Sequence, residues 1–125
     1  MKESEMYKVI RGSLDRIGLQ GYKAYPRKLR INGIKHFAGQ DFLELDVVAW
    51  KNSEVWDIEC KKPCTIEQFG FTLGQVIAYK TLLQGQLLDK LRERIRIVDK
   101  EIGKIVGNVN FYIALLETPE YKLEK

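Results

Sequence analysis

The sequence predicts a single α/β domain, in which helices flank a central mixed β-sheet. Three observations support this fold class. Apolar residues recur at helical spacing near the start of the chain and again after residue 64. Two apolar segments joined by a short polar turn are typical of neighbouring strands, and the apolar run at 108–117 predicts a last, buried strand. Helices and strands that alternate in this way indicate an α/β architecture.

The whole chain has the composition of one folded domain. Its 125 residues are 45% hydrophobic and 30% charged, with a formal net charge of +4, which permits an anionic partner but does not require one. We expect one domain over 1–125, with 118–125 as a polar tail. No apolar run is long enough for a membrane span, and the first residues are too polar for a secretory signal. Cys60, Cys64 and His36 are too few for a closed zinc site. A cytoplasmic, intracellular protein with reduced thiols is therefore expected.

The first element is expected to be a helix. Apolar residues follow helical spacing from Met6 to Ile17, and Ser4 is a plausible N-cap. Gly18 or Gly21 would end this helix, because glycine favours helix termination.

Four strand or loop segments are expected next. A short strand at 22–25 would stop before Pro26, and the basic segment 27–40 is expected to form a loose hairpin or an exposed loop. Strands at 43–50 and 55–62 would follow, joined by the Lys-Asn-Ser-Glu turn.

Two helices are expected after these strands. The first covers 65–83, where Thr65 and Gln68 fit a capping box. Its expected apolar face contains Ile66, Phe69, Leu73, Val76 and Ile77. The second covers 87–105 and carries a heptad-like stripe of Leu88, Leu91, Ile95, Val98, Ile102 and Ile105. We expect this stripe to pack on its own domain, with a dimer seam as the alternative.

Charged side chains lie inside the two predicted central strands. Side chains alternate across a strand, so Asp57, Glu59 and Lys61 would share one face of the second strand. If the two strands pair, Asp46 of the first can approach Glu59 and Lys61. Neighbouring strands lie about 5 Å apart, a separation that suits two carboxylates sharing one cation.

This arrangement has a chemical interpretation and a structural one. Two carboxylates and a backbone carbonyl are hard oxygen ligands suited to magnesium, which activates water and offsets charge on a phosphodiester. A lysine two residues beyond the second carboxylate can orient that water or neutralise the phosphate. The alternative is an amphipathic edge strand whose charged face is solvated.

A polar stripe on the helix at 65–83 consists of Gln68, Thr72, Gln75 and Tyr79. Residues four apart share a helix face, so the stripe could support the metal ligands or contact a nucleic-acid backbone. The alternative is an ordinary solvated side of the helix.

These motifs together resemble the PD-(D/E)XK nuclease superfamily, in particular its RecB-like branch with a Q-x-x-x-Y helix. Asp46 matches the motif aspartate, Glu59-Cys60-Lys61 matches E-x-K, and Gln75 with Tyr79 matches Q-x-x-x-Y. The resemblance covers 4–83, with the strand at Phe111 as a last core element. It implies a restriction-endonuclease-like αβββαβ core with one extra helix in the C-terminal half. The proline of the family name is absent, because Leu45 precedes Asp46.

The resemblance also implies an activity and a site. Asp46 and Glu59 would bind Mg²⁺ or Mn²⁺ with the Cys60 carbonyl as a third ligand, and Lys61 would act on the attacking water. The expected activity is hydrolysis of DNA phosphodiester bonds by an endonuclease or exonuclease.

Further roles follow from the same resemblance. Gln75 and Tyr79 would position the site or the DNA. The family's first helix often carries a glutamate, which would be Glu5 here or, as second choice, Glu3.

A basic cluster before the Asp46 strand is the expected DNA-binding region. Arg27, Lys28, Arg30 and Lys35 could contact phosphates without reading sequence, or could form a solvated loop. Target recognition would otherwise rest on a homodimer, or on a helicase or other DNA-processing partner. Two competing hypotheses remain: a catalytically inactive nucleic-acid-binding or assembly protein on the same fold, and an unrelated α/β domain whose charged strand is an exposed edge.

Overall fold

The computed structural model describes residues 2–34, 41–62, 65–105 and 107–115. Along the chain these form α1 (Glu3–Arg11), a 3-10 helix η1 (Leu14–Ile17), β1 (Lys23–Ala24), β2 (Leu29–Asn32), β3 (Phe42–Leu45), β4 (Val47–Lys51), β5 (Glu54–Lys61), α2 (Ile66–Leu82), α3 (Gln86–Arg96) and β6 (Asn110–Leu115).

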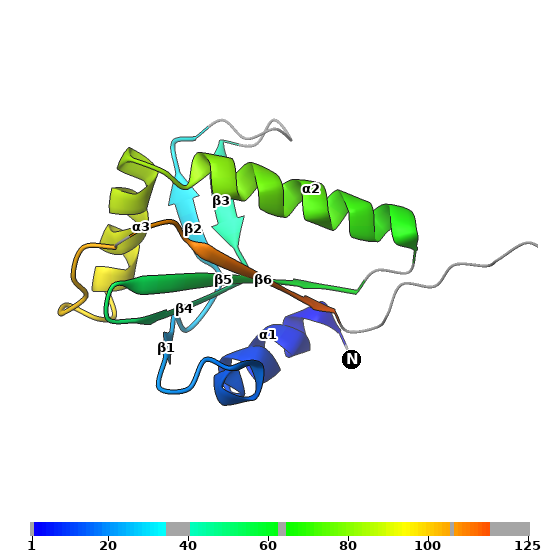
Figure 1. Ribbon diagram of the computed structural model, residues 1–125, viewed down its shortest axis with the longest axis horizontal. Coiled ribbons are helices and arrows are strands. Elements are labelled where there is room, and N and C mark those ends of the chain that lie inside the picture. The colour runs from blue at the N-terminus through cyan, green and yellow to red at the C-terminus, as the bar shows by residue number, and fades with distance from the viewer. Residues whose placement is uncertain (1, 35–40, 63–64, 106, 116–125) are drawn as a thin grey trace, which may run out of the picture.

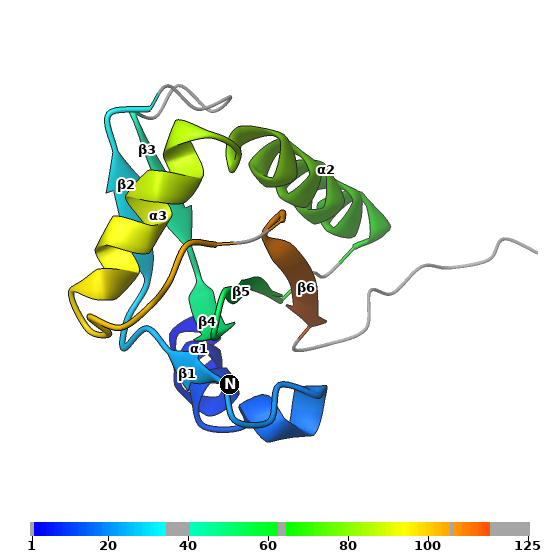
Figure 2. The ribbon, with the colours of Figure 1, turned by 60° about the vertical axis from the view of Figure 1, so that its left-hand side comes forward.

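The central sheet is mixed, as the sequence predicts. Its strand order is β1-β4-β5-β6, with β4 and β5 antiparallel and β5 and β6 parallel. Strands β2 and β3 form a separate antiparallel pair. Helices α2 and α3 lie on one side of the sheet and α1 on the other (Figure 1), and turning the molecule shows α3 beside β2 (Figure 2). Two buried clusters follow, one under α2 and α3 and one under α1.

The chain bends between β3 and β4, and Asp46 lies at the bend. Before the bend β3 pairs with β2, through contacts such as Leu45 with Leu29. After it, β4 pairs with β5, beginning at Val47 opposite Ile58. The single strand expected at 43–50 is therefore two strands in different sheets.

The turn between β4 and β5 is as predicted. Lys51 pairs with Glu54, which leaves Asn52 and Ser53 as the two turn residues. Asn52 has a φ of 57°, a left-handed conformation that asparagine tolerates better than most residues.

The first helix is shorter than expected. It begins after Lys2 rather than after Ser4, which lies inside the helix, and it ends at Arg11. A 3-10 helix follows after Ser13 and is closed by Gly18. The φ of Gly18 is 86°, a left-handed conformation that glycine adopts readily because it has no Cβ atom. The α-helical pattern ends there, because the Gly12 amide still donates to the Lys8 carbonyl four residues earlier but the Ser13 amide donates to the Ile10 carbonyl only three residues earlier.

Helix α2 begins as predicted but faces the opposite way. The Thr65 hydroxyl accepts a hydrogen bond from the Gln68 amide at 3.1 Å. Two residues of the polar stripe, however, are buried: Thr72 is 3% exposed and Tyr79 4%, while Gln75 is half-buried and Gln68 is exposed. Of the expected apolar face, Ile66, Leu73 and Ile77 are exposed and Val76 is buried. The expected apolar face is thus wrong, because the sheet surface that α2 covers carries the charged residues of β5.

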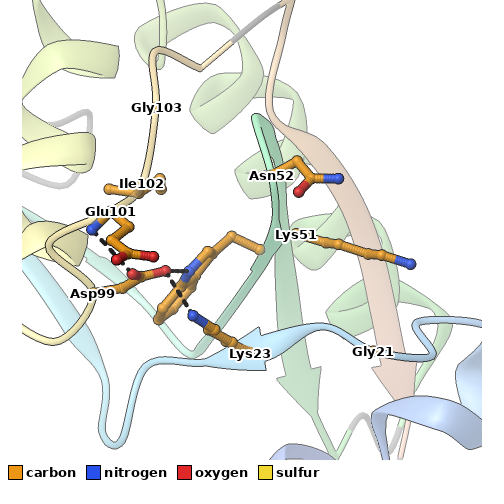
Figure 3. Close-up of a pocket in the computed structure, with 9 residues that line it drawn as sticks. Gly21, Lys23, Lys51, Asn52, Asp99, Glu101, Ile102 and Gly103 are labelled. Carbon is orange, nitrogen blue, oxygen red and sulfur yellow. Dashed lines mark hydrogen bonds and ion pairs between the residues drawn. The ribbon is translucent and has the colours of Figure 1, made fainter.

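Helix α3 ends at Arg96, well before the expected position 105. The Asp99 carboxylate accepts hydrogen bonds from Trp50 Nε1 at 2.8 Å and from Lys23 Nζ at 3.3 Å. Figure 3 shows this contact at the wall of a cavity of about 330 Å³. Lining the cavity are Gly21, Lys23, Trp50, Lys51, Asn52, Asp99, Glu101, Ile102 and Gly103. These contacts fix a turn where the helix would have continued.

The heptad-like stripe therefore does not form a dimer seam. Leu91 and Ile95 on α3, and Ile102 and Ile105 beyond it, all pack into the cluster under α2 and α3, while Val98 is 45% exposed.

Strand β6 is an edge strand and is only partly buried, in contrast to the expectation of a buried strand. Among its described residues Ala114 is buried and Tyr112 is exposed. Across the described ranges, every helix is too short or too polar to cross a membrane.

Candidate active site

Two hydrogen bonds join Asp46 to Glu59 and to the next residue of β5, Cys60. The Asp46 backbone amide donates to Glu59 Oε2 at 3.1 Å, and the Cys60 backbone amide donates to Asp46 Oδ2 at 2.9 Å. Both side chains are buried, with 6% and 1% exposed. The approach of Asp46 to Glu59 that the sequence predicts is therefore present.

The bend at Asp46 explains why these bonds form. The β4–β5 ladder ends at Val47 and Ile58, so the amides of Asp46 and Cys60 have lost their strand partners there. A buried amide without an acceptor is costly. The two carboxylates replace the missing ladder carbonyls, and this fixes their orientation.

Strand β5 is central, which excludes the exposed-edge interpretation. Asp57 and Glu59 lie under α2, whereas Ile58 and Cys60 belong to the cluster under α1. The Cys60 thiol is buried, and burial raises its pKa to about 12. It therefore remains a protonated, unreactive thiol.

Burial acts strongly on the acids of β5. It raises the pKa of Glu59 to about 7 and places the pKa of Asp57 well above its usual range, and in both cases nearby carboxylates add to the rise. Burial raises the pKa of Asp46 as well, against the hydrogen bond from Cys60. The Lys61 ammonium opposes the shift at all three acids, so it lies within electrostatic reach of the group.

Gln75 and Tyr79 lie beside this group on α2. Gln75 Nε2 donates to Tyr79 Oη at 2.8 Å, and the Tyr79 hydroxyl donates to the Glu44 carbonyl at 3.4 Å. Burial raises the pKa of Tyr79, and the charge of Glu59 raises it further. The solvated-side interpretation of this stripe is wrong, because Thr72 and Tyr79 are buried and Tyr79 joins α2 to the backbone of β3.

Lys28 lies closer to the site than the sequence indicated. Its ammonium pairs with Asp46 Oδ1 at 3.6 Å and with Glu44 Oε1 at 3.5 Å, and it also lies over the Tyr7 ring. Burial opposes its charged form, but Tyr7 and Asp46 outweigh this effect and raise the pKa of Lys28. It remains a cation next to the motif aspartate.

The other basic candidates differ in their surroundings. Arg30 pairs with Glu44 at 3.0 Å and lies over the Phe42 ring. Arg27 lies over Tyr25 and donates to its hydroxyl. Lys35 and His36 lie outside the described residues, as does Cys64.

On the first helix the electrostatics favour Glu3 over Glu5. Glu5 is exposed and accepts a hydrogen bond from the Lys2 amide at 3.4 Å. Glu3 is half-buried, and its charge raises the pKa of Asp46. Burial of Met6 orients α1 so that the side chain three positions earlier lies nearer the site.

The metal fit rests on two carboxylates. In the described part of the chain, no three side chains of the His, Cys, Asp or Glu types are grouped closely enough to enclose an ion. Magnesium, however, is often held by one or two carboxylates, with water and substrate phosphate completing its shell. The buried carboxyl group of Asp57 adds further oxygen atoms close to Glu59. The donor set is thus compatible with Mg²⁺ or Mn²⁺.

Sequence reasoning missed one residue of the site, Asp57, and one contact, between Lys28 and Asp46. Asp57 shares a strand face with Glu59 and was visible as the i, i+2 partner, but it belongs to no recognised motif. The Lys28–Asp46 contact spans a turn and a strand, so no local spacing could reveal it. The cavity near Trp50 lies at the other end of β4 and contains none of the candidate residues.

Comparison with known proteins gives no assignment: no family model, no curated protein and no solved structure matches the chain.

Proposed function

We propose that this chain is a metal-dependent deoxyribonuclease with a restriction-endonuclease-like core of the PD-(D/E)XK type. The observation that carries the proposal is the pair of hydrogen bonds, Asp46 amide to Glu59 Oε2 and Cys60 amide to Asp46 Oδ2, that holds the two carboxylates at the end of the β4–β5 ladder. The order of α1, the antiparallel β4–β5 pair, α2 and the parallel strand β6 agrees with such a core.

Each residue has a chemical role in this proposal. Asp46 and Glu59 would hold Mg²⁺ or Mn²⁺ with the Cys60 carbonyl. When bound, such an ion supplies a more acidic water and neutralises phosphate charge. Lys61 would donate hydrogen bonds to the attacking water or to a phosphate oxygen. The water oxygen bonds to phosphorus, the bond to the leaving sugar oxygen breaks, and that oxygen takes up a proton.

Residues around the carboxylates would guide the DNA. Lys28 and Arg30 would attract phosphates to the Asp46 side of the site. Tyr79 and Gln75 would keep α2 in place against β5. Because Lys28 pairs with Asp46 in the free protein, its ammonium would become available to a phosphate once Asp46 binds a cation.

The test is a cleavage assay on supercoiled plasmid, single-stranded DNA and a four-way junction, with Mg²⁺, Mn²⁺ or EDTA. Asp46→Asn and Lys61→Ala should each abolish metal-dependent cutting while remaining folded by circular dichroism. Matched controls are Asp89→Asn, an exposed acid on α3, and Lys51→Ala at the far end of β4; both should cut like the wild type. Cutting that survives Asp46→Asn would refute the proposal.

One observation favours a second candidate, a nucleic-acid-binding protein without catalysis. The Lys28 ammonium already supplies a cation to Asp46 within the chain. A protein of this kind would bind DNA equally with EDTA or Mg²⁺ and would cut none of the three substrates.

A further inference from the structure

Asp57 is a fully buried carboxyl group whose two oxygens have no hydrogen-bond partner within the described residues. It lies on the central strand β5, opposite Val48 of β4 and Phe111 of β6. Both neighbours contribute apolar side chains to the cluster under α2 and α3. Neither a strand edge nor the solvent therefore satisfies this carboxyl group.

A carboxylate in such surroundings needs a counter-charge. An unpaired, buried charge costs several kcal/mol or more by general estimates. The side chains that act most strongly on Asp57 are acidic: Glu59, which is close enough to share a hydrogen with it, and Asp46. When both are ionised, Asp57 and Glu59 have no donor between them, so either a shared proton or a bound cation must take its place. Lys61 counteracts these charges but forms no hydrogen bond to Asp57.

The helix above adds oxygen rather than a donor. Gln75 Nε2 is used by Tyr79, and Gln75 Oε1 is buried without a partner among the described residues. Tyr79 in turn responds to the charges of both Asp57 and Glu59. Two carboxyl groups on β5 thus face a helix whose Tyr79 hydroxyl is within electrostatic reach of both, and oxygen ligands are those that a hard cation prefers.

We propose that Asp57 is a cation ligand outside the recognised motif, and that Asp57 and Glu59 together hold a second divalent cation under α2. The first would lie at Asp46 and Glu59, so Glu59 would serve both positions. This inference deepens the proposed function, on which it rests for the first cation. It assigns a role to Asp57, which the E-x-K motif does not include.

The test counts bound metal and needs no activity. Isothermal titration of the full chain with Mn²⁺ alone at neutral pH should give two ions per chain. Asp57→Asn should bind one ion, because it loses the second cation site. Asp46→Asn should also bind one ion, because it loses the first. Asp89→Asn should still bind two. Since Asn removes a buried charge without changing size, the Asp57 variant should fold, and circular dichroism will check this.

Two outcomes would overturn the inference. The first is wild-type protein that binds only one Mn²⁺ per chain. Asp57→Asn that still binds two ions would show that Asp57 is a protonated structural residue. Two ions with no DNA cleavage would leave this inference standing and remove the nuclease. If Asp46→Asn abolishes metal-dependent cleavage but Asp57→Asn binds as many ions as the wild type, the proposed nuclease stands and the second cation site is refuted.

Discussion

At the scale of single residues, burial of Glu59 links stability to pH. Its pKa in the folded protein is about 7, against an ordinary value of 4.5. Between these values the folded protein holds a proton that the unfolded chain has released. The stabilisation is therefore complete below pH 4.5 and is lost as pH rises through 7, by about 3 kcal/mol for this group. The raised pKa of Asp57 acts in the same direction.

We therefore expect the metal-free protein to be less stable at pH 8 than at pH 5. Urea unfolding in EDTA at the two pH values measures this difference. Glu59→Gln should flatten the dependence, whereas Asp89→Asn should leave it unchanged. A wild-type free energy of unfolding that is equal or higher at pH 8 contradicts the prediction.

Gln75 and Tyr79 should behave as one unit. Tyr79→Phe removes the acceptor of the 2.8 Å bond from Gln75 and leaves a buried amide donor unpaired, so it should cost about 1–2 kcal/mol of stability. Once Gln75→Ala has removed that donor, Tyr79→Phe should cost less. A double-mutant cycle by urea unfolding measures the coupling, and strictly additive losses would show that the hydrogen bond contributes nothing.

At the scale of elements, local signals were sufficient where the determining contact is itself local. The turn between β4 and β5, the Thr65 cap and the i, i+2 face of β5 all follow from residues a few positions apart. The orientation of α2 could not be predicted in this way. An apolar stripe faces the sheet only when the sheet surface is apolar, and here that surface carries Asp57, Glu59 and Lys61.

The inverted orientation of α2 can be tested by substitution. Ile77 is 64% exposed, while Leu83, just after the helix, is 1% exposed. Ile77→Ser should change the free energy of unfolding by about 0.5 kcal/mol or less. Leu83→Ala should cost about 2–5 kcal/mol, because it empties a packed site. Similar losses of unfolding free energy for the two variants would show that Ile77 is buried, as the sequence predicted.

The end of α3 shows the same limitation in another form. The Asp99 carboxylate accepts a hydrogen bond from Trp50, 49 positions earlier. The spacing of the heptad-like stripe cannot predict such a distant contact. Leu91→Ala in α3 should cost about 2–5 kcal/mol, whereas Val98→Ala should have little effect because Val98 lies outside the helix and is 45% exposed. Thermal unfolding of both variants is the measurement, and a large loss at Val98 would indicate a longer helix.

At the scale of the whole molecule, charge is distributed unevenly about the site. The acids Asp46, Asp57 and Glu59 are buried, while the partly exposed Lys28 and Arg30 pair with Glu44, and Lys28 also pairs with Asp46. The cations near the site are thus more accessible to solvent than the acids. The modest net charge of +4 thus understates the local field that a DNA strand would meet.

If the chain binds DNA as proposed, this distribution predicts how the affinity depends on salt. Each phosphate contact lowers the slope of log affinity against log salt by about 0.9 on duplex DNA. The variant Lys28→Gln/Arg30→Gln should therefore bind a short duplex more weakly and with a slope shallower by about 2. A control with the same net charge, Arg16→Gln/Lys51→Gln, removes exposed cations of η1 and β4 and should keep the wild-type slope. Fluorescence anisotropy in EDTA across a salt series, which prevents metal-dependent cutting, measures both. Equal slopes for the two double variants would place the DNA away from the Asp46 side, because affinity would then follow net charge alone.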